Sequence, residues 1–194
     1  DQNQKSIKVG EEAKNVIGQE ENVFFEFKRT IGSPKRYPFF DSDVSSTELS
    51  AFVLQKLKND FESSHGKITD CVITVPANFA NEQREATLAA AKIAGLNTKH
   101  LVNEPTAAAL YYVMSDNEDS DGVYMVFDFG GGTFDTTIVN VKGTNIDVMA
   151  SEGLKKCGGA DLDEAIIKII QKRFKEETGE DLDLSKSNFS TAEA

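Results

Sequence analysis

Cysteine and histidine are scarce in this chain, with two of each among 194 residues. Cys71 and Cys157 lie far apart outside any C-x-x-C spacing, which argues against a zinc or redox motif and favours free, partly buried thiols over a disulfide. His65 and His100 have no acidic or cysteine neighbours at ligand spacing. We therefore assign neither histidine a catalytic role and expect both at the surface.

Long apolar runs and positive charge are also lacking. No stretch approaches the ~18 apolar residues of a membrane span, and no signal-peptide pattern opens the chain, so we expect a cytoplasmic location. Acidic residues outnumber basic ones by 32 to 21, and the net charge of -11 argues against nucleic acid or an anionic membrane as the main partner. A nucleotide remains possible where a cation bridges it to the protein.

The common glycine motifs for nucleotides are absent, because the glycine run here has neither a following Lys-Ser/Thr pair nor a G-x-G-x-x-G spacing. The most informative segment is residues 128–135, in which three glycines are flanked by aspartates. The apolar residues 123–127 before it and the Thr-, Ile- and Val-rich residues 134–141 after it predict strands. The expected element is therefore strand, glycine turn, strand.

This turn has the residue types that a metal-bound phosphate requires. Successive glycines let backbone N–H groups face an anion, Asp128 and Asp135 offer hard oxygen ligands for Mg²⁺, and Thr133 adds a hydroxyl. Phosphoryl transfer needs mainly positioning, charge compensation and an oriented water. A glycine-rich hairpin whose aspartates merely cap the turn is the alternative interpretation.

Elsewhere, predicted helices and strands alternate, which indicates a mixed α/β sheet with helices packed on it. Ser45 and Glu48 form a capping box before a helix whose apolar stripe we expect in the core, and Asn81 is expected to cap the next helix. A glycine cluster places a possible domain boundary near residue 151. The expected strands are at residues 71–75, 100–102, 123–127, 134–141 and 146–150, with a small hairpin or loop at 33–43 and helices at 9–17, 22–31, 45–61, 81–94, 105–112 and 160–178.

The acidic run and the two ends of the chain also carry information. Residues 116–121 are expected to form a solvated acidic loop. The chain begins at Asp1 without an initiator methionine, and residues 190–194 look like a capped helix start that is cut off. These ends predict an excised piece of a longer protein.

Six segments, in order along the chain, resemble the DnaK-type seventy-kilodalton heat-shock chaperone family. They are residues 27–32 (FKRTIG), 72–77 (VITVPA), 83–87 (QREAT), 93–96 (IAGL), 103–110 (NEPTAAAL) and 128–135 (DFGGGTFD). The resemblance implies an actin-like, ribonuclease-H-like ATPase fold with two lobes around a nucleotide cleft. Residues 1–150 would form most of the first lobe and residues 151–194 the start of the second, with ATP or ADP and Mg²⁺ as cofactors.

The resemblance also implies roles for individual residues. Lys28 takes the place of the family's catalytic lysine beside the γ-phosphate, where a compact ammonium offsets developing charge; without the resemblance it would be a solvated helix lysine. Pro76 has an alternative role as a plain strand stop. The implied catalytic residues are Lys28, Glu104, Asp128, Thr133 and Asp135; the nucleotide-binding residues are Gly130, Gly131, Gly132, Thr133, Gly158 and Gly159; the residues near the metal, through water, are Asp128, Glu104 and Asp135; and the interdomain signalling residues are Pro76 and Arg84.

The chain also departs from the family pattern. Nothing before Lys5 resembles the family's first phosphate hairpin, Asp-Leu-Gly-Thr-Thr, and the adenine-binding part of the second lobe is not found. Asn78 stands where a tyrosine is usual, Ala80 and Asn81 replace Asn-Asp, and residues 157–160 (CGGA) replace Leu-Gly-Gly-Glu. We therefore expect this chain alone to bind nucleotide weakly and to hydrolyse little.

The leading functional expectation is an ATP-binding and ATP-hydrolysing domain of a molecular chaperone. Its implied partners are unfolded peptides, bound by a domain that this chain lacks, a J-domain co-chaperone and a nucleotide-exchange factor. The alternative is a non-hydrolysing, chaperone-like interaction protein that uses the lobe as a docking surface, which the substitutions at Asn78, Ala80 and Ala160 motivate. A sugar kinase of the same superfold would need a sugar pocket, and fold alone does not decide between these functions.

Overall fold

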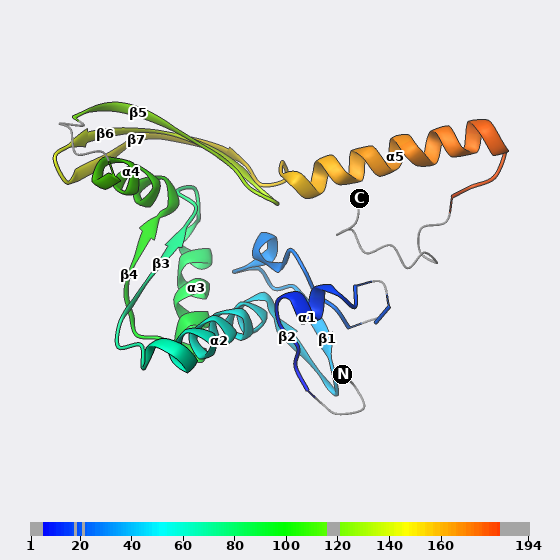
Figure 1. Cartoon of the computed structure of the whole chain (residues 1–194), viewed down its shortest axis with the longest axis horizontal. Coiled ribbons are helices and arrows are strands. Elements are labelled where there is room, and N and C mark those ends of the chain that lie inside the picture. The colour runs from blue at the N-terminus through cyan, green and yellow to red at the C-terminus, as the bar shows by residue number, and fades with distance from the viewer. Residues whose placement is uncertain (1–5, 18, 21, 116–120, 183–194) are drawn as a thin grey trace.

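The computed structural model describes residues 6–17, 19–20, 22–115 and 121–182. In Figure 1, the sheet β5–β7 and helix α5 lie along one side of the molecule, and α2 lies with the hairpin β1–β2 along the other. The helical elements are α1 (Glu11–Lys14), the 3-10 helix η1 (Phe27–Thr30), α2 (Ser46–His65), α3 (Asn81–Ile93), α4 (Glu104–Ser115) and α5 (Gly159–Thr178). The strands are β1 (Arg36–Phe39), β2 (Ser42–Ser45), β3 (Cys71–Val75), β4 (Thr98–Asn103), β5 (Gly122–Phe129), β6 (Phe134–Lys142) and β7 (Asn145–Leu154).

The largest sheet is the antiparallel meander β5–β6–β7, which confirms the predicted strand, glycine turn, strand element. Side chains of β6 alternate between the two faces, and Val139 and Val141 are fully buried on the face that α4 covers. Ala109 of α4 packs against them because its small side chain allows a close approach. This packing anchors the start of β5 and the end of β6, which is the end of the hairpin away from the glycine turn.

Strands β3 and β4 form a separate parallel pair joined by the crossover helix α3. The mixed α/β class is confirmed, but the expectation of one sheet is wrong for the described residues. They form three hydrogen-bonded sheets, of which the third is the small hairpin β1–β2. Helix α4 contacts strands of both larger sheets. The link between them is therefore side-chain packing rather than a continuous hydrogen-bond ladder.

The capping box before α2 is confirmed. Ser45 Oγ accepts a hydrogen bond from the Glu48 amide at 3.3 Å, and Glu48 Oε2 accepts one from the Ser45 amide at 2.7 Å. The apolar stripe of α2 reaches the core only in its first half, where Leu49 is buried, whereas Leu57 and Phe61 remain exposed. The expectation that the whole stripe is core is therefore wrong.

Two expected helix starts also differ from the structure. Ala80, not Asn81, occupies the N-cap of α3, where its amide donates to Gln83 Oε1 at 3.1 Å. The helix expected at residues 22–31 shortens to η1, because Glu26 adopts a left-handed conformation (φ 55°) that interrupts a helix. The expected helix at residues 9–17 shortens to the single turn α1.

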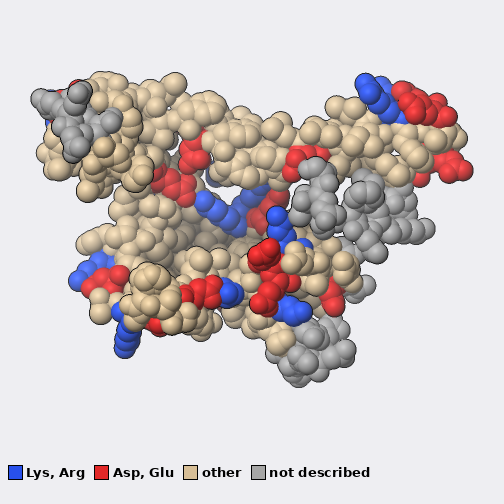
Figure 2. All heavy atoms as spheres, in the orientation of Figure 1, with Lys and Arg blue, Asp and Glu red and all other residues tan. Residues whose placement is uncertain are grey.

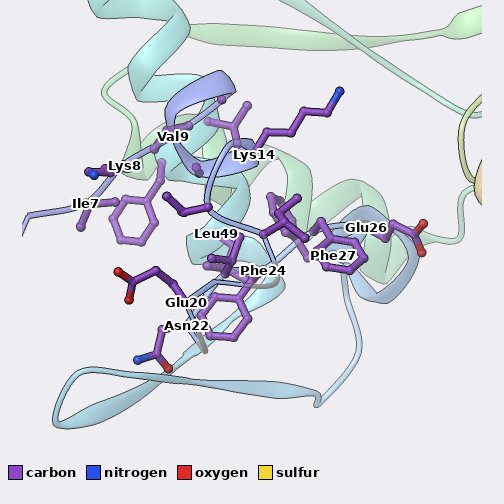
Figure 3. Close-up of a pocket in the computed structure, with 18 of the residues that line it drawn as sticks. Ile7, Lys8, Val9, Lys14, Glu20, Asn22, Phe24, Glu26, Phe27 and Leu49 are labelled. Carbon is purple, nitrogen blue, oxygen red and sulfur yellow. The ribbon is translucent and has the colours of Figure 1, made fainter. Parts of the chain in front are cut away.

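A large cavity of about 900 Å³ lies between the N-terminal segment, α2 and the start of α5. Figure 3 shows Phe24 beside Leu49 on its wall, and Phe24, Phe27 and Leu49 belong to the core cluster around Tyr37 and Val44. Of its described lining residues, none is among the predicted site residues. The catalytic chemistry expected from the sequence is therefore not located in this cavity.

Several smaller expectations can be compared with the structure. Both cysteines are free and partly buried, and both histidines are exposed, as expected. Most of the acidic run at residues 116–121 and the helix start at 190–194 lie outside the described residues. No helix in the described part of the chain combines the length and apolar character of a membrane span. The boundary expected near residue 151 falls inside β7, which pairs with β6 as far as Leu154.

Candidate functional site

A second cavity, of about 490 Å³, brings together most of the residues predicted to act in catalysis. Figure 2 shows acidic and basic side chains gathered around a hollow between the layer of β5–β7 and the layer of α2 and α3. The cavity is lined by Glu26, Lys28, Arg29, Pro76, Asn78, Phe79, Gln83, Glu104, Asp128, Gly130, Gly131, Gly132, Thr133 and Lys155. Segments more than 100 residues apart in the sequence therefore meet at one hollow.

Lys28 and Glu104 form an ion pair on one wall of this cavity. Lys28 Nζ lies 3.0 Å from Glu104 Oε1, although the two residues are 76 positions apart. Lys28 extends from η1 and stays 58% exposed, whereas Glu104 at the start of α4 is 23% exposed. Because surface ion pairs contribute little to stability, this pair matters chiefly for where it holds the ammonium group.

The two aspartates of the hairpin occupy opposite positions on paired strands. Asp128 on β5 is the cross-strand partner of Asp135 on β6, so the two side chains are direct neighbours. Asp128 is exposed to the cavity, whereas Asp135 is only 5% exposed and accepts a hydrogen bond from Asn78 Nδ2 at 2.8 Å. The hairpin thus presents one accessible carboxylate and one buried carboxylate.

Burial raises the pKa of the Asp135 carboxyl above its ordinary value. The negative charges of Glu104 and Asp128 raise this pKa further, while the Lys28 charge and the Thr133 hydroxyl oppose the increase. The three carboxylates therefore interact electrostatically around the cavity. A bound cation would relieve this repulsion between like charges.

The same carboxylates bear on the expected magnesium ion. Among the described residues, no three acidic, histidine or cysteine side chains converge closely enough to form a metal cage. Mg²⁺ keeps several water molecules and is often held by one or two carboxylates together with substrate phosphates. The hard oxygen donors on both sides of the cavity suit such water-mediated binding, so these residues fit the ion.

The glycine turn itself is held from one side by the start of α5. The amide of Gly159 donates to the Gly130 carbonyl at 3.1 Å, and the amide of Ala160 donates to the Gly131 carbonyl at 2.9 Å. Gly158 packs so tightly that a Cβ there would lie 2.5 Å from the Gly131 carbonyl carbon. Gly158 and Gly159 contact the turn from the side of α5, and neither is among the residues that line the cavity.

Pro76 follows strand β3 and lines the cavity, whereas Arg84 is bonded to the segment after Pro76 and is not among the lining residues. The Arg84 side chain donates to the carbonyl groups of Phe79 at 3.0 Å and Ala77 at 3.1 Å, and to Asn103 Oδ1 at 2.9 Å. Asn103 immediately precedes Glu104, and Pro76 is buried at the cavity wall. Arg84 thus connects the segment that contains Pro76 with the residue beside Glu104.

The sequence alone assigned no site role to Arg29 or Asp161. Asn78 was noted only because the resembling family usually has a tyrosine at that position. Arg29 lies at the cavity and forms an ion pair with Asp161 in the first turn of α5 at 2.7 Å. Arg29 and Asp161 are 132 positions apart, so no local sequence pattern predicts their contact. The available signals for a site role were that Arg29 follows Lys28 and that Asp161 lies at a helix start.

Comparison with known proteins connects this geometry with a family. The family described as Hsp70 protein matches residues 37–192. The chain is 45% identical over 176 residues to the chaperone protein DnaK of Methanothermobacter thermautotrophicus, and 44% identical over 181 residues to that of Elusimicrobium minutum. These alignments cover 90% and 92% of this chain but only 29% of each relative, so the chain spans less than a third of their length.

Proposed function

Because the chain belongs to the Hsp70 protein family, we propose that it forms part of the ATP-binding and ATP-hydrolysing domain of a molecular chaperone. The observation that carries this proposal is the shared cavity, in which Lys28 and Glu104 face Asp128 and the glycine turn. A metal-bound triphosphate needs such a combination of cation, carboxylates and free amides. The chain would supply much of this arrangement but not all of it.

The proposed fold is the actin-like, two-lobed ATPase architecture. A junction near residue 151 would divide the continuous strand β7, whereas a junction between Ser115 and Asp121 leaves all three sheets whole. We therefore place the proposed change of lobe between α4 and β5. The cavity residues Lys28 and Glu104 then belong to the first lobe, and residues 128–135 belong to the second.

Several residues of the cavity have a proposed task. Lys28 Nζ, held by Glu104, offsets negative charge on the transferred phosphoryl group. Asp128, exposed at the end of β5, accepts a hydrogen bond from the attacking water and orients it. The amides of Gly131 and Gly132 donate to phosphate oxygens, and Thr133 adds a hydroxyl near the same group.

The cofactors in this proposal are ATP or ADP and Mg²⁺. When bound, Mg²⁺ would neutralise charge on the phosphate oxygens, with Asp128, Glu104 and Asp135 holding its water molecules. Asn78 fixes one oxygen of Asp135 through the 2.8 Å hydrogen bond, so this carboxylate has a defined orientation. Gly158 and Gly159 contact the glycine turn on the side of α5: the Gly159 amide donates to the Gly130 carbonyl, and Gly158 packs against the backbone of Gly131.

The partners follow from the family and are proposed for the longer protein. They are unfolded peptides, a J-domain co-chaperone and a nucleotide-exchange factor, in the cytoplasm. Pro76 and Arg84 would transmit the nucleotide state, since Arg84 joins the Pro76 segment to the residue before Glu104. The alternative of a non-hydrolysing docking protein is less consistent with a cavity that retains Lys28 and its acidic partners.

ATP turnover by the longer protein tests this function. We expect Lys28→Ala to lower turnover about 10²–10³-fold, the usual effect of removing one preorganised charge-stabilising group. The matched control is Lys35→Ala, because Lys35 is an exposed lysine that lies over the Tyr37 ring and is not among the residues that line the cavity. Unchanged turnover in Lys28→Ala, or no turnover in the parent protein, would overturn the proposal.

A further inference from the structure

Arg29 uses both prongs of its guanidinium group to hold a distant helix. Its Nη2 lies 2.7 Å from Asp161 Oδ2, and its Nη1 lies 3.4 Å from Asp161 Oδ1. Nη1 also approaches Glu26 at 3.3 Å, and the Arg29 side chain is only 17% exposed. A two-pronged arginine–carboxylate pair restricts geometry more than a single contact does. Arg29 therefore fixes η1, which carries Lys28, relative to the first turn of α5.

Asp161 also fixes the start of α5 through a hydrogen bond to the backbone. Its Oδ2 accepts a hydrogen bond from the Gly158 amide at 2.9 Å. Partial burial would raise the pKa of Asp161, but the Arg29 guanidinium and the Gly158 amide outweigh that effect and lower the pKa. The carboxylate is thus held in its charged form. The next two amides, those of Gly159 and Ala160, are then aimed at the carbonyl groups of the glycine turn.

The orientation of these carbonyl groups decides where the amides of the turn point. In a trans peptide plane, the C=O of one residue and the N–H of the next point in opposite directions. Because the carbonyl groups of Gly130 and Gly131 face α5, the amides of Gly131 and Gly132 face away from it. Within the described residues, these two amides have no hydrogen-bond partner in the protein.

Arg29 also touches the turn directly. A Cβ at position 132 would lie 2.9 Å from Arg29 Nε, so the guanidinium packs against the bare backbone of Gly132. This Nε is buried and has no hydrogen-bond partner among the described residues. Arg29 thus keeps a buried donor unpaired, which is unfavourable for stability, at its contact with the glycine turn.

We propose that Arg29 and Asp161 are a positioning pair that turns the amides of Gly131 and Gly132 toward a phosphate group. The pair touches no reacting atom; it holds the start of α5 against the carbonyl side of the glycine turn and keeps Lys28 at a fixed distance from it. This inference rests on the proposed function, because it takes the phosphate site from there.

Nuclear magnetic resonance on the ¹⁵N-labelled 194-residue chain tests the pair. The variants are Arg29→Met, Arg29→Lys, Asp161→Asn and the double variant Arg29→Met/Asp161→Asn. The control is Arg36→Met, since Arg36 pairs with Glu48 and is 52% exposed. Two readouts are measured: hydrogen exchange at the amides of Gly159 and Ala160, and the Mg·ATP affinity followed at the amides of Gly131 and Gly132.

We expect Arg29→Met and Asp161→Asn each to speed exchange at Gly159 and Ala160 about tenfold and to weaken Mg·ATP binding about tenfold. The double variant should bind Mg·ATP no more weakly than the single variant with the lower affinity. The effects of two residues that act as one unit do not add. Arg29→Lys, which keeps the charge, should restore part of the affinity, and Arg36→Met should change neither readout. If Arg29→Met or Asp161→Asn fails to fold, Arg29→Lys and the other single variant still decide.

Other outcomes overturn the inference. Unchanged exchange at Gly159 and Ala160 in Arg29→Met would show that the pair does not hold α5 against the turn. Weaker Mg·ATP binding without faster exchange would make Arg29 a direct phosphate ligand instead. If the unmodified chain shows no response to millimolar Mg·ATP, the amides of Gly131 and Gly132 bind no phosphate in this chain and the inference fails, whereas the turnover of the longer protein decides the proposed function separately.

Discussion

The buried carboxyl group of Asp135 gives the site a pH dependence with a definite sign. Because its pKa is raised in the folded chain, the folded state keeps a proton that the unfolded state has already lost. The free energy of unfolding therefore falls as the pH rises from the ordinary aspartate pKa through the raised pKa. Above that window, the charged carboxylate is a cost to the folded state.

We expect Asp135→Asn to raise the free energy of unfolding by about 1 kcal/mol at pH 7, the usual gain when a strained functional group is replaced. Below the ordinary aspartate pKa the gain should disappear, because both states then carry a protonated carboxyl group in the unmodified chain. Urea denaturation at the two pH values measures this, with exposed Asp147→Asn as the control. A loss of stability at pH 7 would contradict the account.

Two adjacent glycines offer a matched test of the contact between α5 and the glycine turn. A Cβ at Gly158 would lie 2.5 Å from the backbone of Gly131, whereas a Cβ at Gly159 would have its nearest contact at 3.8 Å. We expect Gly158→Ala to lower the free energy of unfolding by about 1–3 kcal/mol through overpacking, and Gly159→Ala to be neutral within ~0.5 kcal/mol. Equal effects in thermal denaturation would argue against the close packing.

At this scale, the sequence indicated the residues but not their partners. Lys28, Glu104 and Asp128 lie in short motifs, so the family resemblance assigned them roles before their geometry was known. The contact of Asn78 with Asp135 spans 57 residues, and that of Arg29 with Asp161 spans 132. Such contacts depend on how whole elements pack, and local spacing carries no information about them.

At the scale of elements, the cap of α2 provides the clearest prediction. Ser45 and Glu48 satisfy each other's backbone amides, and hydrogen bonds from the Ser45 amide and hydroxyl lower the pKa of Glu48. We expect Ser45→Ala to lower the free energy of unfolding by about 1 kcal/mol. The control is Ser63→Ala near the other end of α2, where the hydroxyl only bonds back to the Asp60 carbonyl. No difference between the two variants in thermal denaturation would contradict this.

Element types were more predictable than element ends or sheet membership. Apolar runs and the glycine turn gave the hairpin β5–β6 correctly, because alternation and turn residues are local signals. The helix expected at residues 22–31 failed because Glu26 takes a left-handed conformation while Phe24 and Phe27 pack into the Tyr37 cluster. Tertiary packing overrode the helical spacing there. The division of β3–β4 and β5–β7 into separate sheets is a matter of long-range strand pairing, which local spacing does not predict.

At the scale of the whole molecule, the described residues leave large apolar faces exposed. One face of β5 exposes Val123, Met125 and Phe127, and α5 exposes Ile166 and Ile169, each more than half accessible. Exposed apolar patches of this kind promote association. We expect the chain to self-associate with rising concentration in sedimentation velocity, and the substitution Phe127→Lys to reduce this association without lowering the melting temperature. A strictly monomeric chain would contradict this expectation.

On this account η1 and the glycine hairpin hold one metal-bound triphosphate in one cavity, and binding of paramagnetic Mn·ATP tests this most directly. Mn²⁺ broadens nuclear magnetic resonance signals of nearby amides, with Mg·ATP as the diamagnetic control. We predict that the signals of Lys28, Glu104, Gly131 and Gly132 broaden together at millimolar concentration. Broadening on only one wall of the cavity, or only at acidic residues elsewhere, would contradict the account.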